Sequence, residues 1–291
     1  MDGIQGDPGS QKQRGSYLGF GRPRQVWRAA YPMLLFVALN FAVGILFGIL
    51  YYAVGFDVSG HVMEIQLILE VVGFAVFLPL WLRTRRRYTR YSGGRVNWPT
   101  ALLVVGLALG TWSIASILAG LLAPLFPSYR EIEAQLSSGR FVTQLLAVGI
   151  LGPLAEEFCF RGVTLSRMEN LRPWLAVLVT SLLFGVCHLN PVQGIYGALT
   201  GAVLGFLCVR FLTIWYAVIA HMTINLLSVL LIHLPGGDGS QRAAEGILLL
   251  LGIALFFVCG ALLLRRGHPP TPPPPGAPPA APPEFLVRDD P

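Results

Sequence analysis

Long apolar runs, separated by short polar segments, occupy most of the chain from residue 31 onward. A bilayer core about 30 Å thick requires about 20 helical residues at about 1.5 Å each. The runs are continuous and lack a two-residue alternation, so they predict spanning helices rather than membrane strands. We therefore expect an all-α, polytopic membrane protein with about eight spans: Tyr31–Val54, Ile65–Leu82, Ala101–Pro124, Phe141–Arg161, Trp174–Leu189, Ile195–Phe211, Ile214–Leu234 and Gly246–Leu264.

The remaining segments are polar and divide the chain around these runs. Residues 1–30 carry no early apolar core with a cleavage site, so they predict a cytoplasmic N-terminal segment instead of a removable leader. The polar stretch Tyr129–Gly139 predicts an interfacial helix on the outer side. Residues 267–291 are rich in proline and predict a disordered, extended tail. The spans then divide into three parts: 31–140, with the N-terminal transmembrane helices; 141–234, a catalytic core; and 235–266, with the last transmembrane helix.

The composition of the chain indicates which kinds of partner the protein contacts. Charged residues make up only 12% of the chain and apolar residues 54%, whereas soluble domains carry about 25% charged residues. The net charge of +6 comes almost entirely from arginines that lie beside the apolar runs. This pattern indicates contacts with membrane lipids and argues against a nucleic-acid partner.

The arginines also predict an orientation. With eight spans, most of them fall on one side of the membrane, together with both termini. The positive-inside rule then predicts a multi-pass protein of the cell (inner or plasma) membrane with both termini in the cytoplasm. The residues on this side include Arg83, Arg85, Arg86, Arg87, Arg90, Arg95, Arg167, Arg172, Arg210, Arg265 and Arg266, and those opposite are Arg130, Arg140 and Arg242.

Ionisable residues inside the fourth span are the first candidates for a site. A charge at the bilayer centre costs about 2.5–3.5 kcal/mol on insertion scales, so such residues are rare unless they function. Glu157 and Arg161 are four residues apart and predict an ion pair on one helix face. Glu156 is rotated about 100° from Glu157. We therefore expect Glu156 to face an intramembrane catalytic cavity and to act as a general base.

Further polar residues lie in later spans. His221 and Asn225 share one helix face, and Asn225 can donate a hydrogen bond to an oxyanion without carrying charge. His188 ends the predicted fifth span. These residues suit either glutamate-activated water or a zinc site with Glu156, His188 and His221 as ligands. Zinc would leave no evident carboxylate to act as base, so the residues favour a site without an obligatory metal; no other cofactor is indicated.

Three motifs in this order resemble those of the CPBP family (CAAX protease and bacteriocin-processing enzymes), also called Abi or type II CAAX prenyl endopeptidase-like. They are EExxxR at Glu156–Arg161, FxxxH at Phe184–His188 and HxxxN at His221–Asn225. The resemblance covers residues 141–234 and implies an eight-helix intramembrane protease with a conical cavity open to the cytoplasm. A glycine-spaced run between the second and third motifs is also similar: Gly194, Gly197, Gly201 and Gly205.

The resemblance also implies roles for the individual residues. Glu156 and His188 would activate the water, and His221 and Asn225 would stabilise the oxyanion. The site would be supported by the ion pair of Glu157 and Arg161. The depths of these residues are uneven, because at about 1.5 Å per residue Glu156 and His221 lie about 8–10 Å from the inner face and His188 about 20 Å. Convergence then requires the fifth helix to tilt or to begin deeper.

These observations predict an intramembrane endopeptidase that hydrolyses a peptide bond of a membrane-associated peptide or protein. One alternative is a catalytically silent membrane regulator or immunity protein of the same fold. Another is a small transporter that uses the polar residues as an ion relay. The complete set of candidate catalytic residues favours the enzyme, and the absence of an inverted repeat argues against the transporter.

Overall fold

The computed structural model describes residues 23–92, 94–137, 139–168, 171–234 and 239–266. Within these ranges the chain forms helices and no strand; the one isolated bridge pairs Ser92 with Thr213. Residues 267–291, including the predicted proline-rich tail, and most of segment 1–30 lie outside the described residues. The main helices are α2 (Pro23–Val54), α3 (Val62–Arg87), α4 (Trp98–Leu122), α5 (Pro127–Ser137), α6 (Phe141–Gln144), α7 (Gly152–Glu157), α8 (Pro173–Val186), α9 (Pro191–Phe211), α10 (Trp215–Ile232) and α11 (Gly239–Arg265).

Four short elements join or continue these helices. Two are single 3-10 turns, η1 (Ser59–His61) and η2 (Ala123–Leu125). The other two are π-helical, η3 (Leu145–Leu151) and η4 (Phe158–Leu165), and they flank α7. Together α6, η3, α7 and η4 form one continuous span, Phe141–Leu165, which we call the central helix.

The predicted fold class is confirmed. In the described part of the chain, 7 helices are long and apolar enough to cross a membrane. The one predicted span without such a helix is the fifth, Trp174–Leu189, which corresponds to α8; this helix has 14 residues and a length of only about 21 Å at about 1.5 Å per residue. The fifth predicted span was therefore too long, because its helix ends at Val186 instead of Leu189. The protein is a multi-pass membrane protein with one shortened apolar helix.

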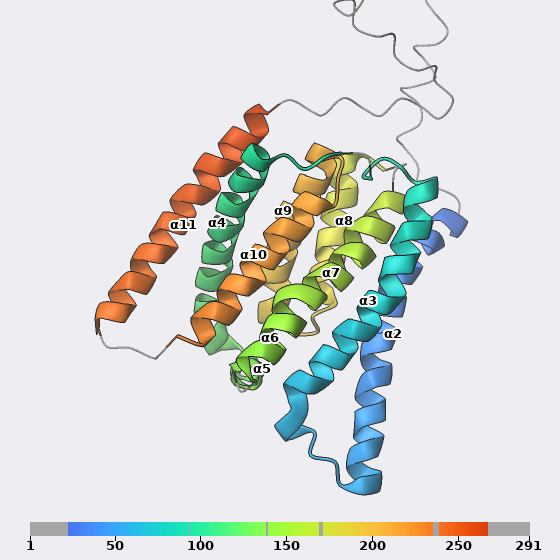
Figure 1. The fold of residues 1–291 in the computed structure, drawn as a ribbon, viewed down its shortest axis with the longest axis vertical. Coiled ribbons are helices and arrows are strands. Elements are labelled where there is room, and N and C mark those ends of the chain that lie inside the picture. Colours follow the sequence, from blue (N-terminus) through green and yellow to red (C-terminus); the bar gives the residue numbers. More distant parts are fainter. Residues whose placement is uncertain (1–22, 93, 138, 169–170, 235–238, 267–291) are drawn as a thin grey trace, which may run out of the picture.

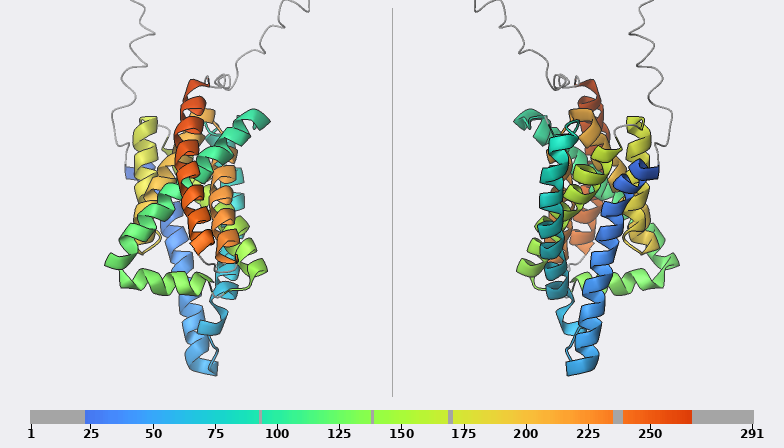
Figure 2. Two further views of the ribbon diagram at one scale, coloured as in Figure 1. Left: turned by 90° about the vertical axis from the view of Figure 1, so that its left-hand side faces the viewer. Right: turned by 90° about the vertical axis from the view of Figure 1, so that its right-hand side faces the viewer.

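The helices run up and down through a flattened bundle (Figure 1). The start of α2, the end of α11 and the loops after α3, η4 and α9 lie at one end of this bundle (Figures 1 and 2). Most of the arginines in the described residues lie in these loops or at these helix ends, which is the one-sided distribution that the sequence predicts. At the other end α5 lies across the bundle (Figure 2), in keeping with the predicted interfacial helix. Which end faces the cytoplasm stays a prediction.

Two apolar clusters hold the bundle together. One joins α2, α3, η4 and α8 around buried aromatic residues such as Phe77, Trp81 and Phe160. The other joins α4, α9, α10 and α11 around aliphatic residues such as Val104 and Leu204. Large apolar side chains on α2 and α11, by contrast, remain exposed. Since lipid tails solvate such surfaces, this distribution suits a bundle embedded in a bilayer.

The neighbours of the central helix position the candidate site. In Figure 1, α7 lies between α3 and α10, and both helices pack against it. The contact with α3 is close, because a Cβ atom on Gly73 would lie 3.4 Å from Cβ of Ala155. On the other side, Asn225 of α10 donates a hydrogen bond of 2.9 Å to the carbonyl oxygen of Val148. The surface of the central helix between these two contacts therefore faces the space shared by α3, α7 and α10.

Candidate active site

Glu157 and Arg161 form the predicted ion pair in the middle of the bundle. Nη1 of Arg161 lies 2.7 Å from Oε1 of Glu157, and both side chains are fully buried. Nη2 of Arg161 donates to the carbonyl oxygen of Gly201 at 3.0 Å, and its guanidinium carbon lies 4.7 Å from the centroid of the Phe184 ring. A charge buried in an apolar interior requires such partners. The pair thus links the central helix to α8 and α9.

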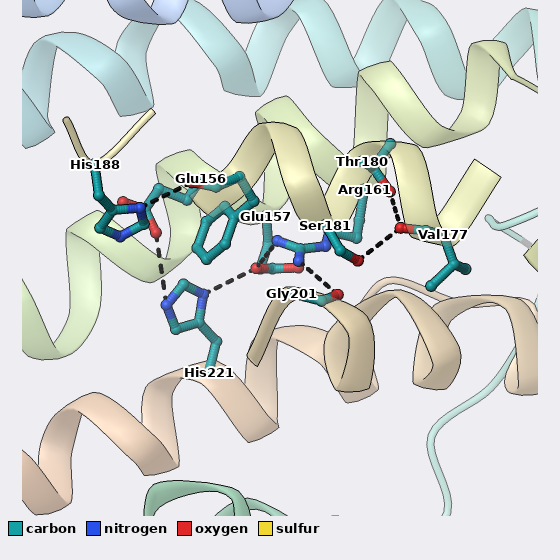
Figure 3. Close-up of polar contacts among 10 residues, drawn as sticks. Glu156, Glu157, Arg161, Val177, Thr180, Ser181, His188, Gly201 and His221 are labelled. Carbon is teal, nitrogen blue, oxygen red and sulfur yellow. Dashed lines mark hydrogen bonds and ion pairs between the residues drawn. The ribbon is translucent and has the colours of Figure 1, made fainter. Parts of the chain in front are cut away.

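His221 joins both glutamates (Figure 3). Its Nδ1 lies 2.9 Å from Oε1 of Glu157, and its Nε2 lies 3.5 Å from Oε2 of Glu156. Oε1 of Glu157 already accepts a hydrogen bond from Arg161. A carboxylate paired with a guanidinium can only accept, so the proton between His221 and Glu157 belongs to the imidazole. Glu157 therefore fixes the orientation of His221 and turns Nε2 towards Glu156.

Glu156 and Glu157 differ in accessibility as the sequence predicts. The side chain of Glu156 is 18% exposed, whereas that of Glu157 is 0% exposed. The three successive positions of α7 explain the difference, because each is rotated about 100° from the last. Ala155 faces α3 and Glu157 contacts α10. Glu156 lies between these two directions and is the carboxylate that a water or substrate can approach.

His188 lies in the turn after α8 rather than at the end of a helix. Its Nδ1 lies 2.8 Å from the carbonyl oxygen of Phe184. This contact folds the imidazole back along α8. The Phe184 ring packs edge-on against both imidazoles, with centroid distances of 5.0 Å to His188 and 5.7 Å to His221. The phenylalanine therefore packs between the two histidines, and Nε2 of His188 has no hydrogen-bond partner among the described residues.

Asn225 occupies the predicted face of α10 but already has a main-chain partner. Its amide donates to Val148 in η3, where the π-helical backbone departs from the usual pairing of carbonyls with amides. π-Helical segments are rare and occur frequently at functional sites. One amide hydrogen of Asn225 is thus used to hold α10 against the central helix. Its second hydrogen is the one that could serve an oxyanion.

Glycines on α9 allow α8 to approach the ion pair. A Cβ atom on Gly201 would lie 3.1 Å from Cα of Ser181 and 3.4 Å from Nη2 of Arg161. A Cβ atom on Gly205 would lie 2.9 Å from Cγ1 of Val177. Small residues at such spacing let membrane helices pack backbone to backbone. The glycine run noted in the sequence therefore gives Arg161 access to a main-chain carbonyl.

The donor groups are not arranged as a metal centre. Among the described residues, no group of three or more His, Cys, Asp or Glu side chains could hold a metal ion. His221 directs both ring nitrogens at carboxylates, and Nδ1 of His188 faces its own main chain. The set considered for zinc, Glu156 with both histidines, thus does not fit the metal in this arrangement. A site without an obligatory metal stays a prediction.

Comparison with known proteins agrees with the motifs. Residues 138–227 match the family model described as type II CAAX prenyl endopeptidase Rce1-like. The predicted family resemblance is confirmed over this segment. The Rce1-like segment contains all six candidate residues and none of the first three spanning helices.

A curated relative extends the similarity beyond this segment. The chain is 24% identical over 249 residues to a protein of Bacillus subtilis (strain 168) named "Putative membrane peptidase YdiL". The alignment covers 79% of this chain and 98% of the relative. No solved structure gives a significant match.

The geometry brings most of the predicted residues together. Contacts run from Glu156 through His221 and Glu157 to Arg161 (Figure 3), with His188 at the Glu156 end of the group. Sequence reasoning missed the contact between His221 and Glu157, although the similar depths counted for the two segments were a signal for it. It also missed both π-helical segments, for which the sequence carries no periodic signal.

Proposed function

We propose that the protein is an intramembrane endopeptidase that hydrolyses a peptide bond of a membrane-associated protein with water activated by Glu156. The single observation behind this proposal is the contact of His221 with an accessible carboxylate on one side and a buried one on the other. An accessible glutamate beside an oriented imidazole is the arrangement that general base catalysis requires. The similarity to membrane peptidases supports the same reaction class.

The proposed reaction uses the two glutamates differently. Glu156 takes a proton from water as the water oxygen attacks the scissile carbonyl carbon. His188, whose Nε2 is available, helps to hold this water. When His221 carries both protons, Nδ1–H is donated to Glu157 and Nε2–H can be donated to the oxyanion. Asn225 adds its second amide hydrogen. Donors that are already oriented lower the barrier most, because they need no reorganisation.

Arg161 and Glu157 act through their neighbours in this scheme. The guanidinium neutralises Glu157, and Glu157 orients His221. An unpaired charge at this depth would cost several kcal/mol. The pair therefore allows an imidazole to work inside the membrane without leaving a buried charge unbalanced.

Substrate trapping tests the proposal. Membranes from cells that carry wild-type protein or Glu156→Gln are compared by co-purification and proteomics, because the variant keeps its shape and loses the base. We expect at least one membrane-associated protein to accumulate on Glu156→Gln and to appear as fragments with wild type. A partner that binds both forms equally and is never cut would instead support the regulator.

A further inference from the structure

A third buried carboxylate approaches the central helix from α3. Glu70 is only 6% exposed, and its Oε1 accepts a hydrogen bond from Nε2 of Gln66. Its Oε2 accepts no hydrogen bond from the described residues. Neither the motifs nor the Rce1-like segment includes Glu70. A nine-tenths-buried carboxylate with one open oxygen in a membrane helix calls for a ligand.

The Glu70 carboxyl lies against the face of α7 that carries Glu156. A Cβ atom on Gly152 would lie 3.4 Å from the carboxyl carbon of Glu70 and 3.6 Å from its Oε2. Gly152 and Glu156 are four residues apart, so they share one face of α7. The glycine thus leaves room for the Glu70 carboxyl about one helical turn, or about 6 Å, from the Glu156 backbone.

The helices on the two sides of this face contribute different polar groups. His221 and Asn225, the proposed oxyanion donors, come from α10. Glu70 comes from α3, which packs on the opposite side of α7. In a trans peptide bond the carbonyl oxygen and the N–H point in opposite directions. A scissile bond over Glu156 with its oxygen towards α10 therefore directs its N–H towards α3.

We infer that Glu70 binds the amine side of the scissile bond. It accepts a hydrogen bond from the scissile N–H of the bound substrate and from the departing amine. This inference rests on the proposed function and extends it, because it assigns to α3 the recognition of a primary amine, the new amino terminus of the product. Among the described residues no cationic side chain contacts the Glu70 carboxyl, so its Oε2 can accept a hydrogen bond from the amine side of a substrate.

The chemical step balances with these groups alone. The water oxygen bonds to the carbonyl carbon and gives one proton to Glu156. The C–N bond then breaks, its electron pair stays on nitrogen, and Glu156 returns the proton to that nitrogen. The proton of the new carboxyl group passes to the amine, which leaves a carboxylate and an ammonium ion. Glu70 holds the nitrogen throughout this sequence.

A binding measurement tests the role of Glu70 without turnover. A trileucine amide with a free amino terminus serves as the product-like probe, and its N-acetyl counterpart serves as the control. The thermal unfolding midpoint of the full-length protein in detergent is measured with each. We expect the free amine to raise the midpoint of wild type more than the acetylated peptide does. This preference should disappear in Glu70→Gln and remain in Glu64→Gln, a matched change six residues earlier on α3.

A cleavage measurement with the trapped substrate completes the test. Glu70→Gln should fold like wild type without peptide and should lower kcat about 10- to 100-fold, the usual weight of a hydrogen bond to a charged group. Glu70→Asp should recover part of the loss. Equal stabilisation of wild type by both peptides, or an amine preference that survives in Glu70→Gln, would overturn the assignment. If Glu156→Gln still cleaves, the proposed function itself fails, whatever the peptides show.

Discussion

Nδ1 of His221 lies 2.9 Å from Oε1 of Glu157, and the contact joins α10 to the central helix across the middle of the bundle. The same oxygen accepts from Arg161 at 2.7 Å. One buried carboxylate therefore fixes a guanidinium and an imidazole at once. The residue next to it, Glu156, remains free to react. This division between a structural and a reactive glutamate leads to the first prediction.

Glu157→Gln should lower both stability and activity. The change removes the negative charge that balances Arg161 and turns a purely accepting group into an amide. Breaking a buried pair by removing one partner costs about 3–5 kcal/mol. Thermal unfolding in detergent should show a clear fall of the midpoint. Glu156→Gln is the matched control and should unfold near wild type; an equal fall in both variants would contradict the division of roles.

Gly201→Ala should disturb the ion pair from the opposite side. The added methyl group would lie 3.1 Å from Cα of Ser181 and 3.4 Å from Nη2 of Arg161. Overpacking of this kind costs about 1–3 kcal/mol, so the unfolding midpoint and the cleavage rate should both fall. Gly120→Ala on α4 is the control, since nothing lies within 4 Å of its Cβ position. A Gly201→Ala variant as stable and active as this control would show that the close packing of α8 and α9 is not needed.

The arginine distribution predicts the orientation. Cysteines introduced singly at Arg86 and Arg130, both exposed positions, are treated with a membrane-impermeant maleimide in a background without the native cysteines. Arg130→Cys should react in intact cells, and Arg86→Cys only after the membrane is permeabilised. The reverse labelling pattern would place the arginine-rich end outside the cell and overturn the topology.

Helix positions and the ion pair could be predicted because they depend on local rules. Apolar runs of spanning length gave α3, α4 and α10 to within a few residues, and the four-residue spacing gave Glu157 and Arg161. Both signals lie in neighbouring residues. The short bridge between Ser92 and Thr213, by contrast, joins distant loops and left no pattern to read.

The rest of the site depends on how helices meet. The backbone changes to π-helical at Leu145–Leu151 and Phe158–Leu165 without any break in the apolar pattern. The early end of α8 likewise follows from the turn before Pro191, not from a change in hydropathy. Glu70 lies outside the three motifs, and only the packing of α3 against Gly152 brings it beside the motif glutamates.

Elemental analysis tests directly whether the active protein contains a metal ion. We expect purified, active protein to contain no stoichiometric zinc or other transition metal by elemental analysis, because no described group of three donors is arranged to hold one. Inhibition by chelators alone would not decide the matter. Stoichiometric zinc that is lost together with activity in His188→Ala would contradict the prediction and restore the zinc alternative.

The central claim is that water activated by Glu156 hydrolyses a peptide bond within the membrane. Cleavage of a purified substrate by the reconstituted protein tests this claim most directly. A substrate captured by Glu156→Gln is purified and mixed in detergent micelles or liposomes with wild type or with the variant. New amino termini are then identified by mass spectrometry. We predict one defined new terminus with wild type and a rate at least about 100-fold lower with a folded Glu156→Gln, the usual scale for loss of a general base. Equal production of that terminus by both proteins, or by neither, would contradict the account.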